Sequence, residues 1–314
     1  MFWDNGASRR AWQRNASDYA RVYLDTGLLT RPGRVVDKLP PWVEGFVARH
    51  HLVAQICVAN DAGGRFDGVM LHALLTHPAD EARVTRELVA MVRDTPFAGV
   101  NIDFESAEGR DRFRFARFLA RLQAALQPLG KSLSVSLPAE TAADATAPWH
   151  RAYSYRLIAP HVHQILVMAY DHAYQGGPPG PIAPSGWVRQ VLAFATRHVP
   201  RALLTLGLPV YGYNWVTRPP YPSTEESLPA IDAWLRAHPA VTPRWDATAG
   251  VPYFVYPSGT NDHYVAYENA ASTKATLRLA GAFGIPAVFT WYVGSEDPAV
   301  GRTLLAGTRR GGRG

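Results

Sequence analysis

Short apolar runs rich in β-branched residues alternate along the chain with longer segments in which apolar residues recur at helical spacing. Short apolar runs bounded by turn residues predict buried strands, and the i, i+4, i+7 spacing predicts amphipathic helices. The predicted strands cover residues 2–3, 21–25, 53–58, 99–104, 133–137, 164–169, 203–208 and 287–291. The predicted helices cover residues 80–92, 109–129, 185–198 and 271–283.

Strands that alternate with helices favour a parallel sheet. About eight such repeats in ~300 residues are typical of a (β/α)8 barrel, whereas an open doubly wound sheet would carry a glycine fingerprint that this sequence lacks. We therefore expect one α/β domain over residues 1–308, a (β/α)8 TIM barrel whose first strand is truncated. Residues 213–268 are rich in proline and aromatic residues and interrupt the alternation. They are expected to form a small α+β insertion between strands 7 and 8, with a helix over 229–236.

The composition excludes several classes of protein. The 314 residues are 47% hydrophobic, so a core can form, but no apolar run approaches the ~18 residues of a membrane span. Three of the six net positive charges lie in the Gly-rich tail 309–314, which is expected to be disordered, and no nucleic-acid motif is present. Cys57 is the only cysteine, which excludes an intramolecular disulfide. The first residues lack a signal-peptide pattern, and we expect a monomer without metal or cofactor.

The predicted fourth strand carries the strongest candidate chemistry. Side chains alternate along a strand, so Asn101, Asp103 and Glu105 share one face while the apolar residues between them share the other. The apolar face must meet the helices, which places the amide and both carboxyl groups inside the barrel near its mouth. Two carboxylates this close repel each other, so one retains a proton near neutral pH and can act as a general acid.

Aromatic and polar residues at other strand ends converge on the same mouth. The candidates are Met168, Tyr170, Asp171 and His172 after the sixth strand, Tyr211 after the seventh and Trp291 at the end of the eighth. Taken alone, a tyrosine or tryptophan at a strand end is as typical of packing as of binding. Two carboxyl groups, a tyrosine and a tryptophan together favour a sugar site, because sugar rings stack on the indole while an acid protonates the glycosidic oxygen.

Several motifs resemble glycoside hydrolase family 18. The resemblance runs through GVNIDFE at 99–105, MAYD at 168–171, GLPVYG at 207–212 and TWYVGSED at 290–297. The spore-cortex-lytic, peptidoglycan-directed N-acetylglucosaminidase branch is the most similar, because it shares GVNIDFE, the GGPP at 176–179 and an AYEN-like segment at 266–269. The resemblance implies hydrolysis of a polysaccharide or oligosaccharide outside the cytoplasm, with peptidoglycan first and chitin oligosaccharide second.

The resemblance also implies roles for individual residues. Glu105 corresponds to the acid/base, Asp103 to the aspartate that turns toward the substrate acetamido group, and Tyr170 to the tyrosine that holds the oxazolinium intermediate. Trp291 corresponds to the floor of the −1 subsite. Asn101, Met168, Asp171, His172 and Tyr211 are the other expected substrate-binding residues. The implied mechanism is retaining and substrate-assisted, so it needs no enzyme nucleophile.

Departures from the family pattern leave alternatives open. Ala98 and Asn101 stand where the general signature has its first two aspartates. A non-catalytic lectin of the same fold is one alternative, although such lectins usually lack the acid that Glu105 provides. A hydrolase domain within a larger envelope protein is another. Glu140, beyond the fifth strand, is the competing candidate for a nucleophile in a two-carboxylate mechanism.

Overall fold

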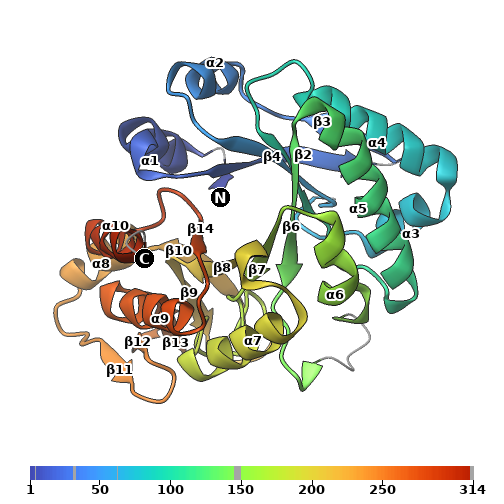
Figure 1. Ribbon diagram of the computed structural model, residues 1–314. Helices are drawn as coiled ribbons and strands as arrows, with labels where there is room; N and C mark the ends of the chain where they lie inside the picture. Colours follow the sequence, from blue (N-terminus) through green and yellow to red (C-terminus); the bar gives the residue numbers. More distant parts are fainter. Residues whose placement is uncertain (4, 31–32, 62, 145–149, 312–314) are drawn as a thin grey trace.

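Eight parallel strands form the centre of the computed structural model, which describes residues 1–3, 5–30, 33–61, 63–144 and 150–311 (Figure 1). In pairing order the strands are β1 (Phe2–Trp3), β2 (Val22–Thr30), β4 (Ala54–Ala59), β5 (Gly99–Asp103), β6 (Ser132–Pro138), β7 (Gln164–Met168), β8 (Leu204–Pro209) and β14 (Ala287–Trp291). The short strand β3 (Arg34–Asp37) pairs antiparallel with the far end of β2. Each strand predicted for the barrel is therefore confirmed, including the two-residue first strand.

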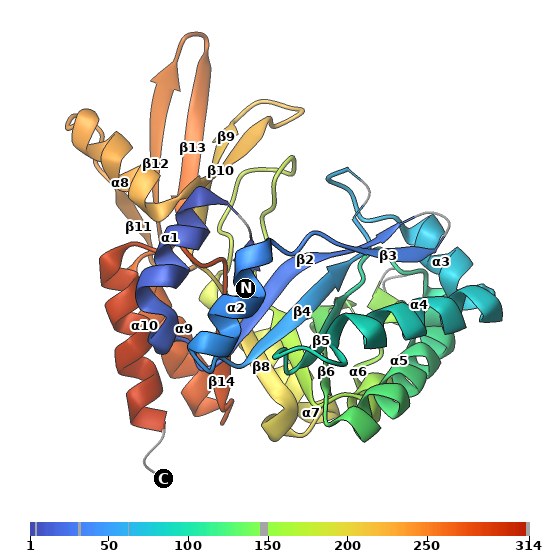
Figure 2. The same cartoon turned by 90° about the horizontal axis from the view of Figure 1, so that it is seen from above.

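The ends of the sheet approach each other as a barrel requires. Among the described residues no ladder pair joins β14 to β1, but Val293 donates its backbone N–H to the carbonyl of Met1 (2.9 Å). Both views place the N-terminal helix α1 (Gly6–Asn15) beside the C-terminal helix α10 (Pro298–Gly311) (Figures 1 and 2). The predicted (β/α)8 fold class is confirmed.

Helices surround the parallel strands. The remaining ones are α2 (Pro41–Arg49), α3 (Gly68–Thr76), α4 (Pro78–Val92), α5 (Arg112–Leu126), α6 (Tyr155–Ile158), α7 (Ser185–His198) and α9 (Ala270–Ala282). Short 3-10 turns cover Ala16–Asp18, Gly109–Asp111, Gln127–Leu129, His150–Ala152, Ala159–His161 and Arg201–Leu203. Helices α4, α5, α7 and α9 agree with the prediction. Helices α1, α2, α3, α6 and α10 were not predicted. The first four have ten or fewer residues, which repeat a helical pattern only a few times, whereas the 14-residue α10 was missed despite its length. Among the described residues, none of the helices combines the length and apolarity that crossing a bilayer needs.

The predicted insertion is a five-stranded antiparallel sheet covered by one helix. Its elements are β9 (Tyr211–Val216), β10 (Ser223–Ser227), α8 (Leu228–Ala237), β11 (Arg244–Asp246), β12 (Val251–Ser258) and β13 (Asn261–Tyr267). The strand order is β10-β9-β13-β12-β11, and the β12–β13 hairpin projects from the barrel (Figure 2). One face packs on α8 through Phe254, Val265 and Tyr267. The sheet begins at Tyr211 rather than at residue 213, because β9 follows β8 almost without a break.

The C-terminal tail departs from the expectation. Helix α10 continues to Gly311, three residues into the segment 309–314 that was expected to be disordered. Threonine and arginine are tolerated in a helix, so residues 308–310 continue it. Residues 312–314 lie outside the described residues.

Gly99 sets the position of β5 against β6. Its φ of +152° is a conformation that L side chains rarely adopt, and a Cβ at this residue would lie 1.8 Å from the carbonyl oxygen of Ser132. Beyond it, Val100, Ile102 and Phe104 are fully buried, and the Phe104 ring stacks on Phe118 of α5 at 5.9 Å. The apolar face of the strand therefore meets the helices, as predicted, and the polar face lies inside the barrel.

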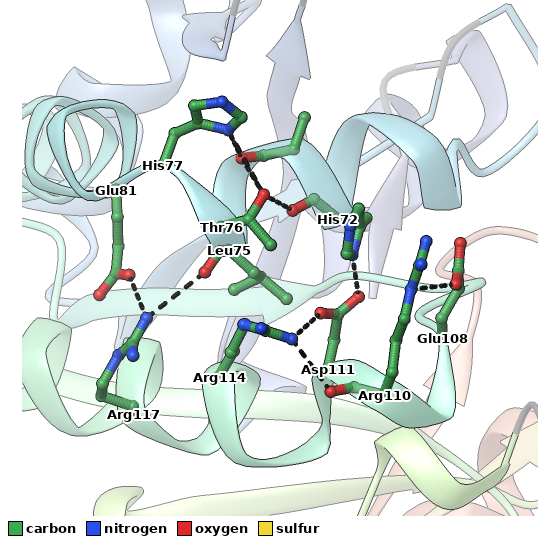
Figure 3. A network of polar contacts seen from close by, with 11 residues as sticks. His72, Leu75, Thr76, His77, Glu81, Glu108, Arg110, Asp111, Arg114 and Arg117 are labelled. Atoms are coloured by element: carbon green, nitrogen blue, oxygen red, sulfur yellow. Dashed lines mark hydrogen bonds and ion pairs between the residues drawn. The ribbon is translucent and has the colours of Figure 1, made fainter.

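A polar network joins the helices that flank β5 (Figure 3). His72 of α3 lies 2.7 Å from Asp111, which also pairs with Arg114 at 3.2 Å. Glu81 of α4 is 1% exposed and pairs with Arg117 (3.1 Å) and Arg121 (2.7 Å) of α5. These pairs satisfy two buried carboxylates and anchor α5 directly after the loop that carries Glu105.

Candidate active site

Asp103 and Glu105 lie at the carboxyl end of β5, inside the barrel mouth. The side chain of Asn60, which follows β4, fixes the backbone of Glu105 from both sides. The Glu105 N–H donates to Asn60 Oδ1 (2.8 Å), and Asn60 Nδ2 donates to the Glu105 carbonyl (2.9 Å). Asn60 is fully buried, so this pair of bonds holds the acid at a defined height above the strand.

Burial raises the pKa values of both carboxyl groups. Burial, followed by the charges of Glu105 and Asp25, raises the pKa of Asp103 well above its usual range. Burial, followed by the charge of Asp171, raises the pKa of Glu105 to about 7. Glu105 is therefore close to half-protonated at neutral pH, the state that a group acting first as acid and then as base requires. The expected effect of paired carboxyl groups is present, with burial as the larger cause.

Asn101 lies beneath Asp103 and is fully buried. Its Nδ2 donates to Ser134 Oγ (2.9 Å), and its Oδ1 accepts from Ser136 Oγ (3.0 Å). Both serines belong to β6, so the amide connects two neighbouring strands within the barrel. A direct contact between Asn101 and a sugar, as expected from the sequence, would require this packed interior to open.

Tyr170 and Asp171 follow β7, which is two strands away from β5 in the barrel. The Tyr170 ring packs edge-on to Phe289 at 6.2 Å, and its pKa is raised by burial and then by the charges of Asp103, Asp171 and Glu105. Asp171 is exposed and has φ +58°, and its carboxyl group accepts from the Tyr211 hydroxyl and from the Tyr213 hydroxyl (3.1 Å). Tyr170 is thus brought together with all three acids.

The remaining predicted residues occupy different depths. Met168 and Trp291 pack beside Tyr170 against buried apolar residues inside the barrel, and both are partly exposed. Tyr211 is fully buried, so its hydroxyl serves Asp171 and does not meet solvent. His172 is exposed, with its ring 5.1 Å from that of Trp187. Met168 and Trp291 therefore line the same mouth as the acids, whereas His172 lies at its rim.

Asp25 and Tyr153 also belong to the site, although they were not predicted from the sequence. Burial raises the pKa of Asp25, at the inner face of β2, to about 6, and its charge acts on Asp103. Tyr153 accepts the Ala107 N–H at 2.9 Å and lines, with Glu105, Ser106 and Pro138, a cavity of about 290 Å³. The alternation in predicted strand 21–25 could have identified Asp25. Tyr153 comes from an irregular segment without a pattern.

Glu140, which follows β6, is buried. Burial and then the charge of Glu140 raise the pKa of Tyr155, whose hydroxyl donates to the Pro138 carbonyl (2.7 Å). The charges that raise the pKa of Asp103 are those of Glu105 and Asp25, and the charge that raises the pKa of Glu105 is that of Asp171. Among the described residues, no group of three or more His, Cys, Asp or Glu is arranged to bind a metal ion.

The chain is similar in sequence and in fold to known proteins. The sequence matches glycosyl hydrolases family 18 over residues 59–296. It is 25% identical over 291 residues to the uncharacterized glycosylase YvbX of Bacillus subtilis, covering 92% of this chain and 84% of that protein. It is 26% identical over 246 residues to the cortical fragment-lytic enzyme of Bacillus subtilis, covering 77% of this chain and 57% of that enzyme. A chitinase from Chromobacterium violaceum superposes with a TM-score of 0.89 at 29% identity, over 100% of this chain and 98% of that one.

The family match includes the strands that carry both carboxyl groups, Tyr170 and Trp291. It covers well over half of the chain, although the chain spans little more than half of the cortical fragment-lytic enzyme. The chain therefore belongs to the glycosyl hydrolases of family 18, and it is a glycosidase built on a (β/α)8 barrel.

Proposed function

We propose that this chain hydrolyses β-linked N-acetylglucosamine units in a glycan by a retaining, substrate-assisted mechanism. The observation that carries the proposal is the state of Glu105, a carboxyl group at the barrel mouth whose pKa burial and Asp171 raise to about 7. It faces the same mouth as Asp103, whose pKa burial raises well above its usual range, and as Tyr170. A proton donor and two groups able to hold an acetamido group therefore meet at one place.

In the proposed reaction, Glu105 donates its proton to the glycosidic oxygen. The carbonyl oxygen of the substrate acetamido group attacks the anomeric carbon as the bond to the leaving sugar breaks, which forms an oxazolinium ring. Asp103 and Tyr170 orient the acetamido group, and the sugar stacks on Trp291. The Glu105 carboxylate then takes a proton from water, whose oxygen attacks the anomeric carbon and reopens the ring with retained configuration.

Peptidoglycan or a related envelope polysaccharide is the proposed substrate. The similarity to the cortical fragment-lytic enzyme supports this choice. Chitin oligosaccharide is the second candidate, supported by the structural likeness to the Chromobacterium violaceum chitinase. A panel of defined glycans, with mass spectrometry of the products, decides between them.

Matched oligosaccharides with and without the N-acetyl group on the −1 sugar test the mechanism. We expect cleavage of the acetylated compound only, because its carbonyl oxygen supplies the nucleophile. Comparable rates on both compounds would contradict the proposal and would point to an enzyme carboxylate such as Glu140 as nucleophile.

A glycan-binding protein without turnover is the alternative function. It predicts binding of the acetylated oligosaccharide without release of new reducing ends. The proposed hydrolase predicts release of reducing ends by the unmodified chain and binding without release by Glu105→Gln. Both assays use the same oligosaccharide, so the two functions give opposite results.

A further inference from the structure

A groove runs between helices α9 and α10 on the outside of the barrel, and both views draw these helices side by side (Figures 1 and 2). Its volume is about 960 Å³, and it is lined by both helices and by residues 285–288, where β14 begins. Trp291, at the other end of β14, lies at the barrel mouth. The groove is therefore at the opposite end of this strand from the acids, and none of the described residues that line it belongs to the proposed sugar site.

The groove reaches between the helices to the strand beneath them. Val288 of β14 lines it and remains partly exposed, whereas every residue of β4, β5 and β8 is buried. The two helices are in contact along part of their length, because a Cβ on Gly307 of α10 would lie 2.9 Å from Leu277 Cδ1 of α9. A helix is about 10–12 Å across, which is too wide to enter a gap between two helices that touch. The shape of the groove therefore favours a thin alkyl chain over a helix.

Apart from its cations, the lining of the groove is apolar. It includes Leu277, Ala280, Ile285, Val288, Ala299 and Ala306. The hydroxyl group of Thr303, the one hydroxyl among the described lining residues, donates to the Ala299 carbonyl of its own helix (2.8 Å). An alkyl chain in the groove would therefore bury no unpaired hydroxyl donor. The volume also lies within the range of about 300–1,000 Å³ that is typical of small-molecule sites.

Three cations line the same groove without an acidic partner. Lys274 and Arg278 are about one turn apart on α9, and Arg302 is on α10; all three are exposed. Neither helix contains an aspartate or a glutamate, and among the described residues none of the three cations forms an ion pair. Like charges held this close repel each other, so an anion that binds among them is stabilised.

The two helices place these cations at a similar height. Helix α9 ends before β14 begins, and α10 begins after β14 ends, so both helices run opposite to the strand. Counted back from the contact between Leu277 and Gly307, Lys274 is three residues away and Arg302 is five. At about 1.5 Å per residue, their backbones differ in height by about 3 Å. One anionic group at the rim can therefore meet cations from both helices.

We propose that this groove binds a long-chain fatty acid, with the alkyl chain against β14 and the carboxylate among Lys274, Arg278 and Arg302. Charge complementarity selects an anionic headgroup, and the narrow apolar gap selects an alkyl chain. The C-terminal segment of the protein is excluded as the occupant, because its charged residues, at 309, 310 and 313, are arginines and have the same sign as the groove. The inference does not rest on the proposed hydrolysis, since it concerns the other end of the barrel.

Isothermal titration calorimetry with dodecanoate, below its micelle concentration at neutral pH and low salt, tests the proposal. We expect saturable binding of one molecule. Decanoate should bind about tenfold more weakly, because it has two CH₂ groups fewer and each buried CH₂ group contributes about three- to fourfold in affinity. Dodecyltrimethylammonium, with the same alkyl chain and the opposite charge, should show no saturable binding.

Two outcomes of this titration would overturn the proposal. One is equal binding of the cationic amphiphile, because the three cations would then select nothing. The other is a failure to bind dodecanoate, even by a protein that binds phosphatidylglycerol vesicles, because a membrane surface would then be the partner.

A matched pair of glycine variants tests whether the ligand occupies the groove. Gly281→Leu places a side chain in the groove, and Gly301→Leu is its control, because Gly301 is on α10 but does not line the groove. A Cβ at either residue meets nothing within 4 Å, so both variants should keep the melting temperature. Gly281→Leu should weaken dodecanoate binding at least about tenfold, and Gly301→Leu should leave it unchanged. Equal affinities of the two variants would contradict the assignment.

A second pair tests the headgroup contact with surface substitutions alone. Lys274→Glu/Arg302→Glu should weaken dodecanoate binding at least about tenfold. Arg189→Glu/Arg197→Glu removes the same charge from exposed positions on α7 and should change binding by no more than about twofold. Equal losses in both double variants would show that net charge, and not the groove, attracts the ligand.

NMR locates the ligand without any variant of the groove. Dodecanoate should shift the methyl resonances of Leu277, Ile285 and Val288, which line the groove, and leave that of Met168 at the mouth unchanged. A shift of the Met168 methyl group without shifts of the other three would overturn the inference, because the amphiphile would then occupy the sugar site.

Discussion

Glu105 differs from a solvated glutamate because of where the barrel places it. A solvated glutamate titrates at about 4.3, whereas burial and Asp171 raise the pKa of Glu105 to about 7. Asn60 fixes the Glu105 backbone without touching its carboxyl group in any bond found among the described residues. The residue is thus rigid in position while its proton remains available.

Glu105→Gln should retain the fold and reduce hydrolysis by at least about 10²-fold, because general acid catalysis contributes about 10²–10⁴ in rate. Reducing-end release and thermal unfolding measure the two effects. Glu108→Gln is the control, since the Glu108 side chain is partly exposed and pairs with Arg110 (2.6 Å). A Glu105→Gln variant with more than about a tenth of the original rate would show that another residue is the acid.

At the scale of elements, α4 and α5 are joined through one buried carboxylate with two partly exposed partners. Glu81 is 1% exposed, while Arg117 and Arg121 are 46% and 53% exposed. Loss of the arginines leaves a carboxylate that water cannot reach, whereas loss of the carboxylate leaves two cations that water can solvate. Removing the two arginines should therefore lower the stability of the protein more than removing the carboxylate.

The double variant Arg117→Ala/Arg121→Ala should lower the free energy of unfolding by about 3 kcal/mol, and Glu81→Gln alone by about 1 kcal/mol. In the arginine-free background the sign should reverse, so that Glu81→Gln stabilises the protein. Urea unfolding of the four proteins at neutral pH measures this cycle. If Glu81→Gln destabilises both backgrounds equally, the carboxylate does not depend on the arginines.

At the scale of the whole molecule, buried acids determine how stability varies with pH. Burial raises the pKa values of Asp25 to about 6, Glu105 and Glu225 to about 7, and Glu268 to about 8. In the unfolded chain these groups titrate at about 3.9–4.3. Between those values the folded state binds more protons than the unfolded state, so stability falls as pH rises. His172 and the Met1 amino group, whose pKa values burial lowers, oppose this trend but are outnumbered.

The melting temperature should therefore be higher at pH 5 than at pH 8. Glu268→Gln, which imitates the protonated acid, should match the unmodified chain at pH 5 and exceed it at pH 8, because Glu268 is 3% exposed and its pKa is raised to about 8. Differential scanning calorimetry across this range measures both effects. A melting temperature that rises steadily from pH 5 to pH 8 would contradict the expectation.

The elements that the sequence predicted well are those buried on two sides. A strand inside a parallel barrel is apolar on its helix side, and at β5 this leaves Asn101, Asp103 and Glu105 as a visible exception. The edge strands β3, β10 and β11 were not predicted, because an exposed edge tolerates polar residues and carries no clear alternation. Short helices were not predicted for a related reason, because a few turns show little periodicity.

By itself, the sequence determined the barrel, the inward position of Asp103 and Glu105 and the place of Tyr170 and Trp291 at strand ends, because these follow from alternation along single strands. Only the tertiary structure decided what surrounds those residues. It brought Asn60 to the Glu105 backbone, placed Asp25 beside Asp103 and connected Asn101 to two serines of the neighbouring strand. These relations join residues on different strands and loops, and burial, which raises the pKa values, exists only after the chain has packed.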